Sequence, residues 1–114
     1  MTYEIPFSSA APSLSDIFTE LTARTGLPLS LASPSVGIGA VHHSEFSCTP
    51  MIACSEKAVS VSVFIGEDSY ILLALLATLV HMGGAYPGEL PGYAYARWDA
   101  LVDVHDEIRD ATRE

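Results

Sequence analysis

The feature that most limits how this chain can fold is the run SYILLALLATLVHMGG, residues 69–84. Its apolar part is about 13 residues long, whereas a helix needs roughly 20 such residues to cross a bilayer. Asp68 precedes the run as a candidate N-cap, and Gly83 and Gly84 follow it, where the end of a helix favours left-handed backbone. The run therefore predicts a helix that other elements cover on most sides, in the centre of the core.

The composition predicts one globular domain spanning residues 1–114. Apolar residues make up 49% of the chain and charged residues 17%, far from the composition of disordered proteins. The formal net charge of −9 argues against nucleic acid or an anionic membrane as the partner. The first residues lack Lys, Arg and an apolar block of secretory length, so we expect no signal peptide and a cytoplasmic location.

The segments before the central helix predict a strand and a helix. In residues 2–7 the apolar side chains alternate, and Pro6 restricts this strand to an edge or an end of a sheet. Ser13 and Asp16 resemble a capping box, apolar residues then recur at helical spacing, and Gly26 ends the helix. LASPSVGIG is predicted to be a turn-rich connector. GIGAVHHSEFSC and AVSVSVFIG alternate as strands do, and TPMIACSEK between them supplies a short middle strand and a turn.

The segments after the central helix predict a loop and an amphipathic helix. AYPGELPGYAY has the Pro and Gly residues of an ordered surface loop. In ARWDALVDVHDEIRDATRE, helical spacing gathers Trp98, Leu101, Val104, His105 and Ile108 on one side and four carboxylates on the other. The carboxylates either solvate an exposed helix or form an electrostatic docking surface for a cationic partner. They are Asp99, Asp103, Asp106 and Asp110.

These elements predict an α+β fold. We expect a small antiparallel sheet of three or four strands packed on one face by the buried central helix, with an N-terminal helix and a C-terminal amphipathic helix. One sheet face would be apolar and consist of Val59, Val61, Val63 and Ile65. The other would be an open platform showing His43, Glu45, Ser60, Ser62 and Phe64. An aromatic residue among polar neighbours indicates binding, and Phe64 has that position.

Catalytic and metal sites have little support in the sequence. Strand alternation places His43 and Glu45 on one face as neighbours, the minimum for acid–base chemistry. We expect that face to point to solvent, because the opposite face looks buried and holds Ile38, Ala40, Phe46 and Cys48. Cys48 and Cys54 lack the spacing of common zinc sites, and a chain that is not exported would keep them reduced. No nucleophile elbow, P-loop or dinucleotide fingerprint is present. We expect no enzymatic activity, no metal and no cofactor.

The order of elements resembles that of small bacterial immunity proteins of polymorphic toxin systems. The resemblance covers most of the chain and depends on an N-terminal Y-x-I strand, a helix ending in TG, a meander, the stretch L-x-x-L-x-H-M-G-G and the stretch P-G-Y-A-x-x-R-W. It implies a non-enzymatic protein that binds one cognate toxin and blocks its active site or another needed surface. Many such toxins are basic nucleases, whose phosphate-binding surface a carboxylate-rich protein can occupy. The family shares no universal binding residues.

The candidate partner-binding residues therefore come from the patterns above. The first candidate surface is Asp99, Asp103, Asp106 and Asp110, and the second is His43, Glu45 and Phe64. Three other functions fit the sequence. They are a secretion chaperone or adaptor, a small hydrolase-type enzyme using His43 and Glu45, and a nucleic-acid-mimicking inhibitor of host or phage proteins.

Overall fold

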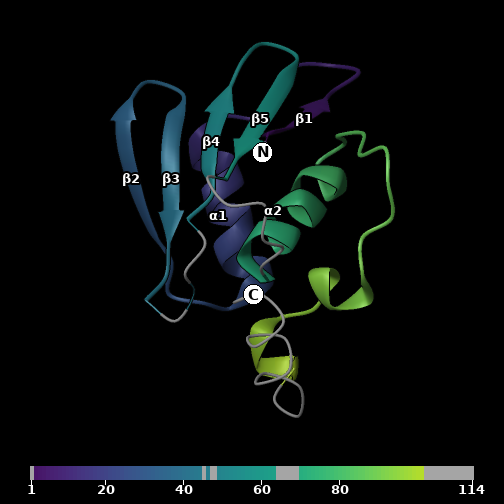
Figure 1. The fold of residues 1–114 in the computed structure, drawn as a ribbon. Helices are drawn as coiled ribbons and strands as arrows, with labels where there is room; N and C mark the ends of the chain where they lie inside the picture. Colours follow the sequence, from purple (N-terminus) through teal and green to yellow (C-terminus); the bar gives the residue numbers. More distant parts are fainter. Residues whose placement is uncertain (1, 45, 47–48, 64–69, 102–114) are drawn as a thin grey trace.

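Five antiparallel strands form one sheet in the computed structural model, which describes residues 2–44, 46, 49–63 and 70–101 (Figure 1). The strands lie in the order β1-β5-β4-β3-β2, so four consecutive strands form a meander and the N-terminal strand joins β5 at the far edge. Their bounds are β1 Thr2–Pro6, β2 Ser30–Ser35, β3 Ile38–His42, β4 Met51–Cys54 and β5 Ala58–Ser62.

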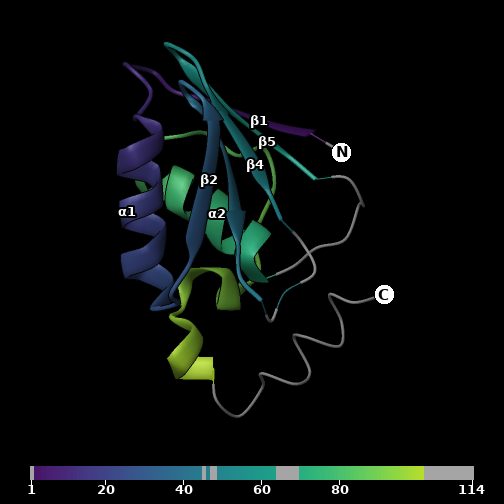
Figure 2. The same ribbon diagram turned by 90° about the vertical axis from the view of Figure 1, so that its left-hand side faces the viewer.

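Two α-helices cover the same face of the sheet. They are α1, Leu14–Thr25, and α2, Tyr70–His81, and they also contact each other (Figure 2). α1 connects β1 to β2, and α2 follows β5. Since an antiparallel sheet needs only one covered face, this two-layer arrangement is stable with the second face in contact with solvent.

The ends of α1 are those that the sequence predicts. The Ser13 side chain accepts a hydrogen bond from the Asp16 backbone N–H at 3.2 Å, which satisfies one of the free donors of the first turn. Gly26 ends the helix with φ +72°, and its N–H donates to the Thr22 carbonyl. Between these caps the buried positions are Leu14, Ile17, Leu21 and Thr25.

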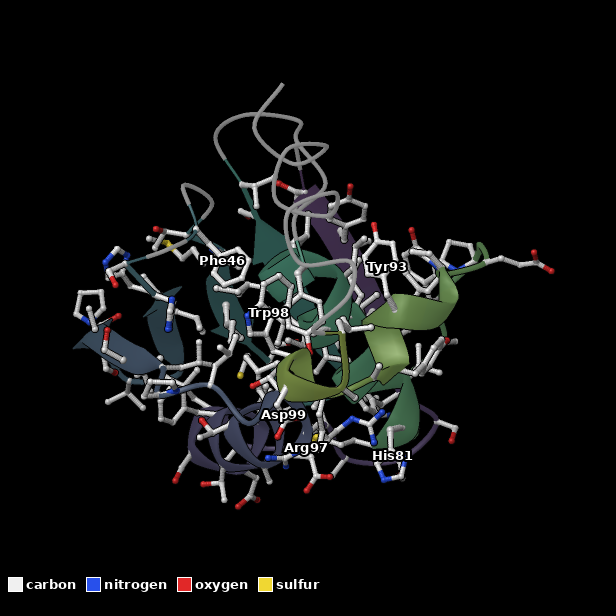
Figure 3. All side chains as sticks on the ribbon, turned by 90° about the horizontal axis from the view of Figure 1, so that it is seen from below. Phe46, His81, Tyr93, Arg97, Trp98 and Asp99 are labelled. Atoms are coloured by element: carbon white, nitrogen blue, oxygen red, sulfur yellow. The ribbon has the colours of Figure 1, made fainter. Side chains whose placement is uncertain are left out.

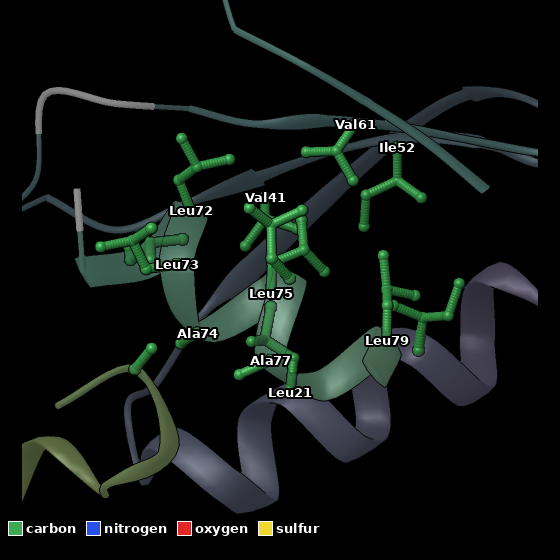
Figure 4. Packing of buried hydrophobic residues seen from close by; sticks show 14 of the residues in the cluster. Leu21, Val41, Ile52, Val61, Leu72, Leu73, Ala74, Leu75, Ala77 and Leu79 are labelled. Carbon is green, nitrogen blue, oxygen red and sulfur yellow. The ribbon is translucent and has the colours of Figure 1, made fainter. Parts of the chain in front are cut away.

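The prediction of a buried central helix is confirmed. Every residue of α2 from Tyr70 to Leu79 is buried. Figure 4 shows Leu75 and Leu79 between the sheet and α1, and α2 also contacts the segment Gly92–Tyr95, so that more than one side of the helix is covered. Thr78 is polar but fully buried, and its hydroxyl donates to the Ala74 carbonyl within the helix at 2.7 Å.

The Gly83-Gly84 pair ends α2 and brings the chain against β1. Gly83 has φ +106°, which residues with a side chain rarely adopt. Gly84 donates to the Leu79 carbonyl at 2.9 Å and forms an isolated bridge with Phe7, and the next residue donates to the Pro6 carbonyl. A Cβ atom on Gly84 would lie 2.5 Å from Ile5, so this contact is possible only for glycine.

The prediction of a three- or four-stranded sheet with one packing helix is wrong. The sheet has five strands, and the segment expected to be a connector contains the extra strand, β2. Its sequence, SLASPS, lacks the alternation of a core strand because β2 is an edge strand, in which only Leu31 packs against the core. The second correction is that α1 as well as α2 covers the sheet.

The end of the described chain differs from the predicted long helix. Two short 3-10 helices occur there, η1 Gly92–Tyr95, within the predicted loop, and η2 Trp98–Leu101. Ala94 and Trp98 are buried, so these two side chains join the core, while the other residues of the segment are exposed or half-buried. The remainder of the predicted amphipathic helix, residues 102–114, lies outside the described residues.

Candidate partner-binding surface

The face of the sheet opposite the helices is an exposed surface to which all five strands contribute. Strand register identifies its members, because residues paired across strands point to the same side. Val59 and Val61 of β5 are fully buried under the helices, so their neighbours Ala58, Ser60 and Ser62 point the other way. We call this set the open sheet face: Thr2, Glu4, Pro6, Ser30, Ala32, Ile38, Ala40, His42, Met51, Ala53, Ala58, Ser60 and Ser62.

The open sheet face is nearly uncharged. Its side chains are mostly Ala and Ser, and Glu4 is the single carboxylate in the set. All of them are exposed or half-buried, and Met51 is the large apolar side chain that is most exposed there, at 37%. Val36 stands beside this face at the tip of the β2–β3 hairpin and is fully exposed. The scarcity of charge and the exposed Met51 and Val36 are features shared with the centre of a protein–protein interface, where charged residues are depleted.

The faces of β3 are opposite to those predicted from its sequence. We expected Ile38 and Ala40 to be buried, but Gly39 and Val41 are buried, and Ile38 and Ala40 belong to the open sheet face. The cause is the close approach of α1. A Cβ atom on Gly39 would lie 3.0 Å from Leu14 of that helix, so the helix packs where the strand has no side chain.

His43 does not lie on the open sheet face. β3 ends at His42, and His43 begins a turn in which its carbonyl accepts a hydrogen bond from the Phe46 N–H at 3.1 Å. The His43 ring packs edge-on against the Phe46 ring, with 5.5 Å between the ring centres. Glu45 and Phe64, predicted to act with His43, lie outside the described residues, so this second candidate surface stays a prediction.

An aromatic cluster fixes the lower end of the helix layer. Trp98 packs against Tyr70 and Phe46, with ring centres 4.7 and 5.1 Å apart, as Figure 3 shows for Trp98 and Phe46. The Tyr70 hydroxyl donates to the Ala96 carbonyl. Burial of the ring raises the pKa of Tyr70 to about 12, so it remains a neutral donor. These residues are far apart in sequence, and the sequence analysis did not predict the cluster, since it placed Trp98 on the apolar side of a long helix.

Asp99, the first member of the predicted acidic surface, is already paired within the chain. Its two carboxylate oxygens accept hydrogen bonds from Arg97 at 3.2 and 3.4 Å. The same guanidinium donates to the Ala23 carbonyl in the last turn of α1 at 2.9 Å (Figure 3). Arg97 thus stabilises the carboxyl end of a helix, where a cation is favoured, and Asp99 orients it. Asp103, Asp106 and Asp110 lie outside the described residues.

The remaining reactive side chains form no site in the part of the chain that the structure describes. Cys54 is a free cysteine that packs against the core, and burial raises the pKa of its thiol, so the unreactive protonated form is favoured. Cys48 lies outside the described residues. Within the described ranges, no three His, Cys, Asp or Glu side chains are grouped so that they could hold a metal ion. No described helix combines the length and the apolar character needed to cross a membrane.

Comparisons with known proteins add no relative to this description. No family model matches the chain, and neither the curated proteins nor the solved structures include a significant match.

Proposed function

We propose that this protein is an immunity protein that binds a cognate protein toxin in the cytoplasm and neutralises it by covering its active site or another needed surface. The observation that carries the proposal is the open sheet face, an exposed and nearly uncharged platform in a chain of net charge −9. The choice of a toxin as the partner is supported by the resemblance of the P-G-Y-A-x-x-R-W and L-x-x-L-x-H-M-G-G stretches to those of immunity proteins.

The exposed apolar atoms of the open sheet face and the net negative charge of the chain have different roles in binding. Exposed apolar atoms around Met51 and Ile38 lose contact with water when a partner covers them, which stabilises the complex and slows its dissociation. The net negative charge acts at longer range and accelerates the approach of a basic partner. Because Asp99 is paired with Arg97, we assign this steering to the charge of the whole chain and not to Asp99 alone.

The decisive experiment is growth rescue. The neighbouring open reading frame is expressed under tight control in a heterologous bacterium, with and without this protein, and surviving cells are counted. Restored growth together with co-purification of the two proteins supports the proposal. A neighbour that is harmless, or that kills equally in both cases, contradicts immunity to that gene product.

Two variants with the same change in charge locate the binding surface. Ala53→Arg places a long cation in the middle of the open sheet face, between Ile38 and Ser60 in the strand register. Thr19→Arg places the same charge on an exposed position of α1, on the other side of the molecule. We expect loss of rescue for Ala53→Arg and unchanged rescue for Thr19→Arg. Equal rescue by both variants would show that the partner binds elsewhere.

A secretion chaperone or adaptor is the second candidate, because the same platform would also bind a protein client. The two functions differ in what happens to the partner. A neutralised toxin is inactive in the purified complex, whereas the client of an adaptor stays active and only gains solubility or delivery. An activity assay on the purified complex, with the partner alone as the control, therefore separates the two.

A further inference from the structure

The edge strand β2 is exposed, yet it lacks the charges that protect most edge strands. Residues 25–44 contain no Asp, Glu, Lys or Arg, although the chain has 19 charged residues (five basic and 14 acidic). Residues 69–88 also lack charge, but they include α2, which is buried. Burial does not explain the first run, because five of the six residues of β2 are exposed. Exposed edge strands usually carry charges that prevent pairing with another chain.

Hydrogen-bond directions show that β2 can accept another strand. The Val41 N–H donates to the Pro50 carbonyl at 2.9 Å, on the side of β4. Leu31 is the β2 residue opposite Val41, so in an antiparallel ladder this is a pair without mutual hydrogen bonds. The N–H and C=O of Leu31 therefore point away from β3, toward the free edge of the sheet, where β2 is the outermost strand in Figure 1.

The opposite edge of the sheet is protected. β1 has Glu4, whose charge disfavours pairing with a further strand. Its end is also covered, since Phe7 forms a bridge with Gly84 and the Ala85 N–H donates to the Pro6 carbonyl at 3.0 Å. The protection of one edge and the lack of charge on the other distinguish β2 as the available edge.

We propose that β2 is a self-association site, at which two copies of this chain pair their β2 strands antiparallel and form one continuous ten-stranded sheet. Charge selects a second copy as the occupant. Two chains of net charge −9 repel each other, and they can approach most closely through the one exposed hairpin that has no carboxylates. A basic partner would instead be attracted to the carboxylates elsewhere. This inference goes beyond the proposed function and does not depend on it.

The outward N–H and C=O of Leu31 also determine the register. A twofold axis at Leu31 lets the two Leu31 residues exchange both backbone hydrogen bonds. Ala32 of one copy then lies opposite Ser30 of the second copy on the merged open sheet face, with no charge on either. On the helix side, Leu29 and Leu31 are only partly buried in the single chain, and a second copy would cover them further. The pairing is short, because Pro34 and the irregular register between Ala32 and Ser35 interrupt β2.

Complementary charge variants test both the site and the register. Ser30→Glu/Ala32→Glu places like charges opposite each other in the dimer, and Ser30→Lys/Ala32→Lys does the same with the opposite sign. Both side chains are exposed, so each variant should fold, as circular dichroism would verify. The control Thr2→Glu/Ser8→Glu makes the same change in charge at two exposed positions near β1.

Analytical ultracentrifugation of each protein over a wide range of concentrations gives the answer. We expect dimers for the unchanged chain and the control, monomers for each β2 variant alone, and dimers when the Glu and Lys variants are mixed. Hydrogen exchange of the Leu31 amide should slow as the concentration of the unchanged chain rises. An unchanged chain that stays monomeric up to its solubility limit would overturn the proposal, as would a dimer indifferent to the Glu pair or two charged variants that do not recombine.

Discussion

Replacing Gly84 by Ala should destabilise the protein more than any other exchange of a glycine for alanine at the end of α2 or in the segment after it. The new Cβ atom would lie 2.5 Å from Ile5 and 2.9 Å from the Leu79 carbonyl oxygen. The carbonyl is backbone and accepts the Gly84 hydrogen bond, so it cannot move without loss of that bond. Overpacking costs about 1–3 kcal/mol, and the weakened hydrogen bond costs about 1 kcal/mol. We expect a total loss of about 3 kcal/mol in the free energy of unfolding.

Two other glycines separate the possible causes. Gly83 has φ +106° and nothing within 4 Å of its ideal Cβ position, so Gly83→Ala tests backbone strain alone, at a cost of about 1–3 kcal/mol. Gly92 also has open space, without a positive φ, so Gly92→Ala should change stability by less than about 0.5 kcal/mol. Each exchange adds one methyl group, so the differences report the surroundings of each position.

Urea unfolding followed by tryptophan fluorescence measures all three variants. Trp98 is the only tryptophan of the chain and lies in the aromatic cluster, so its emission reports the packed core. The urea concentration at the midpoint of unfolding should decrease, while the slope of the free energy of unfolding against urea concentration stays constant. In a thermal scan, about 3 kcal/mol corresponds to a decrease in Tm of roughly 12 °C for a domain of this size. If Gly84→Ala were as stable as Gly92→Ala, the contact between the end of α2 and β1 would not be as tight as described.

Three further variants test the contacts below the helix layer. Tyr70→Phe removes the donor to the Ala96 carbonyl and should lower the free energy of unfolding by about 1–2 kcal/mol. Burial raises the pKa of Tyr70 from 10.0 to about 12, so this side chain ionises at lower pH in the unfolded chain than in the folded one. The free energy of unfolding should therefore fall as the pH rises between these two values, and it should fall less steeply in Tyr70→Phe. Urea unfolding at each pH measures this difference. Arg97→Ala should cost about 1 kcal/mol through its bond to Ala23. Asp99→Asn should cost less than about 0.5 kcal/mol because the ion pair is exposed, and equal losses for these last two variants would contradict the assigned roles.

The sequence predicts those elements whose burial is complete or whose ends have local signals. α2 is recognisable because it is apolar on all sides and ends in two glycines, and α1 because Ser13 and Gly26 cap it. β2 is not recognisable, because an edge strand with a single inward-facing leucine lacks the alternation of apolar and polar residues that indicates a strand. β3 was assigned the wrong faces because the inner position that α1 approaches is Gly39, which carries no apolar side chain.

The candidate surface could be predicted only in part. Ser60 and Ser62 were expected on the open platform and do lie on it, because β5 alternates regularly with its buried valines. Ile38, Ala40, Met51 and Ala53 were missed, since small apolar residues look like core unless the pairing of β3 with β4 is known. The Arg97 contact with Ala23 joins positions 74 residues apart, and no local pattern indicates such a contact.

The position of residues 92–101 explains how the protein can leave one sheet face free. Trp98 packs against Tyr70 of α2, and Arg97 bonds to the end of α1, so this segment holds both helices at the lower end of the helix layer. Stability therefore comes from the packing of the two helices on one sheet face and from the contacts of residues 92–101 with those helices. The side chains of the open sheet face contribute little to the core. Substitutions there can change binding without unfolding the protein. Ala53→Arg should accordingly unfold at nearly the same urea concentration as the unchanged chain while losing its partner, and a large loss of stability would contradict this separation.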